Sequence, residues 1–405
     1  MSNFEEKVLD FFKKNIHIIL VVLTVVGGLW ARKKGIWFES GDYKYFLSEW
    51  FKIFKGLGGI HSLYAPYYNY YIPYVIIVGL PSYIDSFTTD DLLIYLKGIS
   101  IFFELLSATM AMLIAKKALQ EFNKQTKCYV LVFVAVFLSP MVVLNGAFWC
   151  QCDYIYLFFV LAAIYAYMNN KMNLVFILLG VSLAFKFQMV EIVPLFALLY
   201  LCNKKFSILK VGWTLLVFFV AGLPAIFVGK SFADTYLTYF NIVGMDSVLS
   251  VNALNIYNFF PNSRRNEFLI FGMIIFVTLL AIVAYWFVSN GFMFDTKLII
   301  YTAVISAGIC YIFMPNMHER YCAMWVLMAY IYYIVYDRKR IFLPIVLDAV
   351  AITKYFSYLY PEEYSPGVSW AVLSIVNIVI LLYMLSDWMK VVKEQNQHMS
   401  EMIDG

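Results

Sequence analysis

Three side chains that could act together stand next to one another in the stretch FMPNMHERYC, at residues 313–322: His318, Glu319 and Arg320. The planar guanidinium of arginine matches a phosphate group and can donate two hydrogen bonds to it at once. Imidazole can also donate to phosphate, whether it is protonated or neutral. The triplet therefore predicts a phosphate site in which Arg320 is the main ligand, His318 supports it and Glu319 orients one of the two.

A candidate general base lies far upstream, at Asp42 in the stretch ESGDYKYFLSEW. The residues after it form an aromatic amphipathic segment that would lie along a membrane surface and hold the loop there. A carboxylate fixed at that depth can take a proton from a hydroxyl group. The alternative is that Asp42 is a solvated cap, as we expect of Glu39 and Glu49.

Other ionisable groups lie at or within apolar runs, where charge is costly and points to function. Lys186 is a second candidate ligand for phosphate, unless it pairs with Glu191. Lys97 could instead extend toward the membrane surface, and it stands two helical turns from Glu104, too far for a direct bond. As functional groups, Lys97 and Glu104 would contact substrate or orient the groups that do.

A further polar group opens an apolar run, where Trp149, Gln151 and Asp153 follow the sequence NGAF. Tryptophan is typical of the aromatic belt at a membrane surface. Gln151 and Asp153 either cap the helix that follows or contact a ligand. Both interpretations place these side chains at the end of a helix.

The composition indicates that these elements lie in a membrane. Of 405 residues, 63% are hydrophobic, 19% aromatic and 14% charged, so an all-α polytopic membrane protein is predicted. The net charge of +4 does not indicate a nucleic-acid partner. Cys150 and Cys152 have no second pair with which to form a zinc site, and the chain has no Gly-rich loop for a nucleotide phosphate.

Apolar runs predict about twelve membrane-spanning helices. They lie near residues 16–31, 92–115, 128–146, 153–168, 172–186, 188–202, 207–228, 267–289, 297–314, 321–336, 341–357 and 368–388. A shorter run at 71–84 contains Pro73, Gly79 and Pro81, which favours a re-entrant or interfacial segment. No cleavage site follows the first run, so we expect an uncleaved span there.

The spans divide the chain into four regions. Residues 1–15 form a cytoplasmic amphipathic helix, and residues 16–228 form a transmembrane module with a long outer loop at 32–91. A large outer loop follows at 229–266, and residues 267–405 form a C-terminal transmembrane module with a cytoplasmic tail.

Lysine and arginine predict the orientation of these spans. With both termini inside, nearly every short cytoplasmic loop is basic, in agreement with the positive-inside rule. If residues 71–84 formed a span, the basic loops that follow would lie outside, against the positive-inside rule. The basic residues 32–34 fall outside, but they belong to a long loop, and long loops cross largely regardless of charge. The polar groups described above then gather on the outer side, which places the chemistry there.

The order of these motifs resembles the GT-C superfamily of integral-membrane glycosyltransferases, which use polyprenyl-phosphate sugars. The likeness covers residues 38–321, from SGDYKYFLSEW through YNYYIPYVIIVGL, KGISIFFELL, LSPMVVLNGAFWCQCDYIY and LAFKFQMVEIVP to MPNMHERY. Bacterial transferases that decorate surface polysaccharides are the more similar members, and the first mannosyltransferase of GPI-anchor synthesis is similar at a greater distance. The resemblance implies a GT-C-like fold.

The resemblance also implies roles for single residues. The family's catalytic base falls on Asp42, and Ser40 replaces the first of two acids often found there, which weakens the case for a metal. Glu104 stands where the second span often has aspartate, and Cys150 stands where bacterial relatives have glycine. The family's lysine before FQ is present as Lys186, and its HER triplet is complete.

The reaction that the resemblance implies is transfer of a monosaccharide, with inversion, from a polyprenyl-phosphate carrier to a glycan hydroxyl. Asp42 would take the acceptor's proton, and Arg320, supported by Lys186 and His318, would stabilise the departing lipid phosphate. The implied partners are the donor lipid, the acceptor glycan and the membrane, without nucleic acid. No cofactor is indicated, although a divalent metal stays possible. The implied location is the bacterial cytoplasmic membrane, with the site on its outer side.

Aromatic side chains such as Trp149, Tyr43 and Tyr257 would stack on sugar rings. Two alternative functions stay open. One is a transporter or flippase of lipid-linked sugars, and the other is a polymerase or ligase of surface polysaccharide that uses a diphosphate-linked donor.

Cysteine labelling of intact cells tests the predicted orientation. In a cysteine-free background, a Lys117→Cys variant should be protected from a membrane-impermeant maleimide, because residue 117 lies in a predicted cytoplasmic loop. A Ser263→Cys variant, in the predicted outer loop, should react. Labelling of residue 117 from outside would contradict the topology.

Overall fold

The apolar runs of the sequence become helices, which satisfy their own backbone hydrogen bonds in an apolar solvent. The computed structural model describes residues 3–66, 70–121, 126–243 and 248–404. In these ranges the secondary structure is helical apart from two isolated β-bridges, which join Val251 and Asn252 to His318. The prediction of an all-α membrane protein is confirmed at this level.

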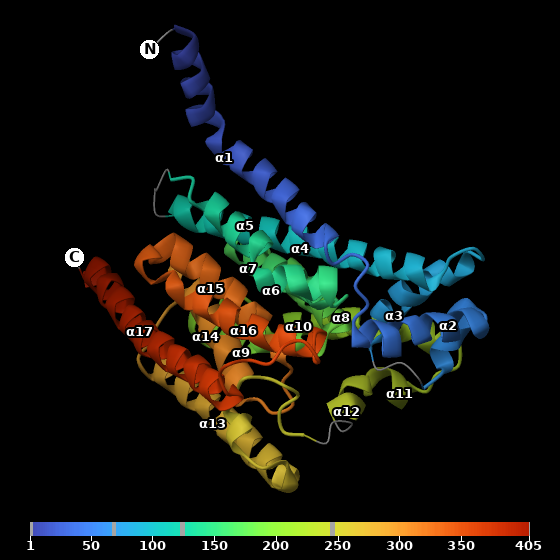
Figure 1. Cartoon of the computed structure of the whole chain (residues 1–405). Coiled ribbons are helices and arrows are strands. Elements are labelled where there is room, and N and C mark those ends of the chain that lie inside the picture. The colour runs from blue at the N-terminus through green and yellow to red at the C-terminus, as the bar shows by residue number, and fades with distance from the viewer. Residues whose placement is uncertain (1–2, 67–69, 122–125, 244–247, 405) are drawn as a thin grey trace.

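The N-terminal helix α1 (Asn3–Lys33) runs without a break through the predicted boundary at residue 15. Its first half projects beyond the rest of the bundle, and Phe4 near its start is 74% exposed (Figure 1). At its other end, Arg32 is buried between α1 and the helices that follow. The position of its start relative to a membrane stays a prediction.

The loop after α1 folds into short helical segments. They are the π-helical turn η1 (Tyr43–Leu47), α2 (Ser48–Gly56), η2 (Gly59–Tyr64), α3 (Ile72–Gly79) and η3 (Leu80–Tyr83). The aromatic face of the amphipathic stretch packs inward, with Trp50, Phe51 and Phe54 buried against α3 and its neighbours. The predicted non-crossing run thus forms an apolar helix of twelve residues, Ile72–Tyr83.

The middle of the chain contains the helices that carry most of the predicted site. They are α4 (Thr89–Glu121), α5 (Tyr129–Leu138), α6 (Pro140–Val143), the π-helical turn η4 (Leu144–Phe148), α7 (Asp153–Met168), α8 (Met172–Phe185), η5 (Phe187–Ile192) and α9 (Val193–Asn203). The chain bends by 47° between α5 and α6. Proline 140 explains the bend, because it has no N–H to continue the helix.

The remaining elements complete the bundle. They are η6 (Ile208–Lys210), α10 (Val211–Phe227), α11 (Phe232–Tyr236), α12 (Thr238–Val243), η7 (Ile256–Phe259), η8 (Asn262–Arg264), α13 (Arg265–Ser289), α14 (Thr296–Phe313), η9 (Glu319–Cys322), α15 (Ala323–Tyr336), η10 (Arg338–Arg340), α16 (Phe342–Leu359) and α17 (Trp370–Asp404). Helices α13 and α17 lie side by side, with the rings of Trp286 and Trp388 6.0 Å apart (Figure 1).

Burial separates central helices from peripheral ones. Every residue of α15 from Ala323 to Val335 is buried, and 89% of the apolar stretch of α14 is buried against 11% of that of α13. A helix that stays apolar but unburied is expected to face lipid. We therefore assign α14 and α15 to the centre of the bundle and α1 and α13 to its periphery.

In the part of the chain that the structure describes, seven helices are long and apolar enough to cross a membrane, and the bent segment from α5 to η4 would make eight. The other predicted spans, near 153–168, 172–186, 188–202 and 321–336, form shorter helices. Helix α7 has 16 residues and α15 has 14, roughly 24 and 21 Å against the roughly 30 Å of a bilayer core. The prediction of an all-α membrane protein holds, whereas the number of twelve spans stays a prediction.

Candidate active site

The site lies in a cavity of about 580 Å³ at the end of the bundle where α7 begins and α8, α14 and α16 end. Part of its lining is polar, with Asp42, Gln151, Lys186, Glu319, Arg320 and Tyr358. The rest is mainly apolar and includes Trp50 from α2 and Leu269 and Met273 from α13. Because α7, α8 and α15 are short, their ends leave room for this cavity.

The centre of the site is a buried cluster of charges around Asp153. One oxygen of this carboxylate forms an ion pair with Lys186 Nζ, and the other lies 3.6 Å from Arg320 Nε. Asn145 Nδ2 donates a hydrogen bond of 2.8 Å to the same second oxygen. Asp153 is 1% exposed, so a single buried carboxylate is the shared counter-charge of two cations that would otherwise repel each other.

This arrangement decides between alternatives that the sequence left open for two residues, Asp153 and Lys186. Asp153 is the first residue of α7, and its carboxylate contacts side chains and does not cap the helix. Lys186 pairs with Asp153, and no ion pair joins it to Glu191 in the described residues. Both Glu191 oxygens lack a hydrogen-bond partner among those residues, although Glu191 is 1% exposed.

Asp42 is held at the edge of the cavity by three neutral donors. Its Oδ2 accepts hydrogen bonds from Gln151 Nε2 and, at 2.9 Å, from Trp149 Nε1. Its Oδ1 accepts a hydrogen bond of 2.5 Å from Tyr358 Oη. Arg320 Nη1 lies 4.0 Å from Oδ2, and the Asp42 side chain keeps 20% of its surface exposed. The carboxylate is thus oriented and also accessible from the cavity.

Irregular backbone on two separate segments aims these groups at one another. Asp42 directly precedes the π-helical turn η1, and Trp149 directly follows the π-helical turn η4. Cys150 has a positive φ of 66°, which lets the side chains of Trp149 and Gln151 both reach Asp42. π-helical turns and residues with a positive φ occur frequently at functional sites, where the surrounding fold compensates for their strain.

The HER triplet also lines the cavity. Glu319 Oε1 lies 3.6 Å from Arg320 Nη1, as expected of a carboxylate that orients the guanidinium. Burial raises the pKa of Glu319 to about 7, although the charge of Arg320 favours its anion. His318 loses hydration and faces Arg320 and Lys186, so its pKa is held well below its usual value. We therefore expect His318 to be neutral at physiological pH.

Three predicted residues support the site from behind and do not line the cavity. Lys97 Nζ donates to the carbonyls of Gly35 and Phe38, at 2.7 and 2.5 Å. Glu104 forms an ion pair of 2.6 Å with Arg32, and the Tyr43 hydroxyl donates to the carbonyl of Thr89. These bonds fix the end of α1 and the segment that leads to Asp42.

The predicted aromatic platforms are covered. Trp149 is fully buried and stacks on Tyr358 with 4.3 Å between ring centroids, so it orients Asp42 instead of facing the cavity. Tyr257 is buried, and its hydroxyl donates to the carbonyl of Phe313 at 2.8 Å. The expectation that Trp149, Tyr43 and Tyr257 stack on a sugar is therefore not supported by their placement.

Sequence reasoning missed Tyr358, Asn145 and Arg32, which touch Asp42, Asp153 and Glu104. Asn145 lies within a quoted motif and could have been singled out as a polar residue in an apolar run. Tyr358 follows the predicted span at 341–357, and a tyrosine at a span end is too common to be a signal.

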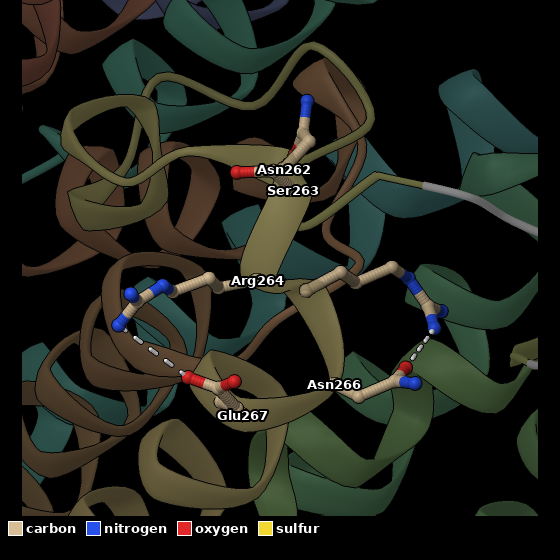
Figure 2. A pocket seen from close by; sticks show the side chains of 6 residues that line it. Asn262, Ser263, Arg264, Asn266 and Glu267 are labelled. Carbon is tan, nitrogen blue, oxygen red and sulfur yellow. Dashed lines mark hydrogen bonds and ion pairs between the residues drawn. The ribbon is translucent and has the colours of Figure 1, made fainter.

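A second hollow, of about 330 Å³, lies at the start of α13 and is lined by residues 262–267 (Figure 2). Arg264 lies 3.9 Å from Glu267, and both side chains are more than 60% exposed. Surface pairs of this kind contribute little binding energy. We therefore place the candidate active site at the larger cavity.

The described residues contain no group of three or more histidine, cysteine, aspartate or glutamate side chains placed to hold a metal ion. No protein-family model and no curated protein matches the chain.

Removal of the Asp153 charge tests the buried cluster. An Asp153→Asn variant leaves Lys186 and Arg320 without their shared counter-charge, so the free energy of unfolding should fall by about 3 kcal/mol. Thermal unfolding of the purified protein in detergent measures the effect. Glu191→Gln is the matched control, because it changes an equally buried carboxyl group that has no ion pair among the described residues and should alter stability much less. Equal stability of the two variants would contradict the cluster.

Proposed function

We propose that this protein is an inverting glycosyltransferase of the GT-C type. It moves a monosaccharide from a polyprenyl-phosphate carrier to the hydroxyl of a surface or lipid-linked glycan. The observation that carries the proposal is the placement of an accessible carboxylate, Asp42, 4.0 Å from the buried guanidinium of Arg320 in one cavity. Transfer from a phosphate carrier needs these two functions close together, a base for the acceptor and cations for the leaving group.

The acceptor oxygen attacks the anomeric carbon from the face opposite the phosphate. Asp42 takes the hydroxyl proton as the new carbon–oxygen bond forms. The bond between the anomeric carbon and the phosphate oxygen breaks, and the polyprenyl phosphate leaves with an added negative charge. Arg320 and Lys186 stabilise this charge, since both are already held in place by Asp153. Neutral His318 can add one hydrogen bond.

The apolar wall of the cavity supports a lipid-linked donor. Leu269 and Met273 stand four residues apart on α13 and both line the cavity. Residues with this spacing share one face of a helix, and α13 is a peripheral, apolar helix of a length that can cross a membrane. A polyprenyl chain could reach the cavity past α13 without passing through water.

The transporter alternative is less well supported. A transporter of lipid-linked sugars typically has internal repeats and polar groups near the middle of its spans, whereas the charges of this site gather at helix ends. A polymerase or ligase would share the base and the cations but would act on a diphosphate carrier. With the predicted topology, the site faces the outer side of a bacterial cytoplasmic membrane.

A complementation experiment tests the proposed function. Deletion of the gene should remove one side-branch sugar from the surface glycan, as measured by mass spectrometry, and the wild-type gene should restore it. Asp42→Asn keeps the size of the side chain and removes the base, so transfer should fall by about a hundredfold or more and the sugar should stay absent at equal protein level.

Glu49→Gln is the matched control, since Glu49 is an exposed acid of the same loop that pairs only with Lys52 in the described residues. It should restore the sugar fully. Loss of the whole polymer on deletion would favour a polymerase or transporter, and full restoration by Asp42→Asn would rule out Asp42 as the base.

A further inference from the structure

Tyr358, in the last turn of α16, contributes its side chain to the site, although it lies outside the sequence motifs that predicted the site. Tyr358 Oη donates to Asp42 Oδ1 at 2.5 Å, while the Tyr358 ring stacks on Trp149 with an interplanar angle of 15°. Trp149 in turn donates to Oδ2. Two stacked aromatic side chains therefore hold the same carboxylate, one through each of its oxygens.

The two oxygens of Asp42 have different surroundings. Oδ2 accepts from Trp149 and Gln151 and lies 4.0 Å from Arg320. Oδ1 accepts a single hydrogen bond from the described residues, that of Tyr358. A carboxylate oxygen offers about two lone-pair sites. Oδ1 is thus the oxygen that has a site left for an incoming hydroxyl group.

The direction of the reaction leads to the same oxygen. The leaving phosphate belongs beside Arg320, which approaches Asp42 from the Oδ2 side. Inversion requires the acceptor to attack from the side opposite the phosphate. The acceptor hydroxyl therefore approaches along the Oδ1 side, next to Tyr358, and both Asp42 and Tyr358 line the cavity.

We propose that Tyr358 is a positioning residue that makes Oδ1 of Asp42 the proton-accepting atom and marks the side of the cavity at which the acceptor hydroxyl binds. This inference rests on the proposed function. The proton of the acceptor passes to Oδ1 as its oxygen bonds to the anomeric carbon and the polyprenyl phosphate departs. Tyr358 keeps its own proton throughout and holds the Asp42 carboxylate in one orientation, with Oδ1 beside the acceptor.

The packing around Tyr358 is arranged for this contact. Gly41 precedes Asp42, and a Cβ at this position would lie 3.3 Å from Tyr358 Oη, so glycine permits the close approach of α16. Tyr355, one turn earlier on α16, packs edge-on against Trp149 at 5.0 Å and is fully buried. Tyr355 anchors the helix, whereas Tyr358 keeps part of its surface exposed and faces the cavity.

A Tyr358→Phe variant tests the role, because it removes the hydrogen bond and keeps the stacked ring. Purified protein is added to membranes of the deletion strain, which supply both the donor and the acceptor, and the initial rate of transfer is measured at neutral pH. The rate should fall about tenfold, as expected on loss of a hydrogen bond to a charged group.

Tyr355→Phe is the matched control, because among the described residues the hydroxyl of Tyr355 makes only a long contact of 3.5 Å with Asn145. Its rate should equal that of the wild type. Tyr358→3-fluorotyrosine keeps both the stacked ring and the hydrogen-bond donor, so it should keep the rate of the wild type even if the phenylalanine variant proves unstable.

The outcomes separate the two claims. Absence of transfer by the wild-type protein overturns the proposed function. Transfer by the wild type and none by Asp42→Asn, with equal rates for the wild type, Tyr358→Phe and Tyr358→3-fluorotyrosine, overturns the role of Tyr358 alone.

Discussion

The shared carboxylate of Asp153 is the interaction on which the site depends. Two cations at the end of an apolar bundle would repel each other and lose hydration, and a single buried anion between Lys186 and Arg320 offsets both effects. Arg320 then extends from Asp153 to Glu319 and to the edge of Asp42. The cations are therefore placed before any substrate arrives, which is the condition under which charges stabilise a transition state most effectively.

The fold supplies this cluster by interrupting its helices. Helix α7 begins at Asp153 and helix α8 ends at Phe185, directly before Lys186, and both are shorter than the thickness of a bilayer core. The π-helical turns η1 and η4 place Asp42 and its donor Trp149 beside Arg320. Behind them, Arg32, paired with Glu104, fixes the end of α1. The Arg32–Glu104 pair does not touch the cavity, but it holds in place the backbone that carries the charged groups of the site.

Four residues that the sequence singled out meet in the structure, and their roles stay predictions. Asp42, Asp153, Lys186 and Arg320 lie far apart in the chain but meet in the structure, because polar residues in so apolar a chain are found mainly at helix ends and in loops. Helix lengths were less predictable, since apolar runs continue through the irregular turns at the site. Tyr358 was missed because nothing in its own neighbourhood distinguishes it from other tyrosines at helix ends. Arg32 and Glu104 are 72 positions apart in the chain, so their pairing depends on tertiary packing, which the periodicity of the sequence does not predict.

A structure of the protein with bound undecaprenyl phosphate, determined by electron cryomicroscopy, tests the central claim most directly. In the proposed reaction this lipid is the leaving group whichever sugar is transferred, so the measurement does not depend on knowing the donor. The account predicts a phosphate that touches the guanidinium of Arg320 and lies beside Lys186, with its chain passing Leu269 and Met273 on α13. A phosphate more than about 6 Å from Arg320, beyond the range of a direct charge pair, and seated beside another cation such as Lys354 would contradict it.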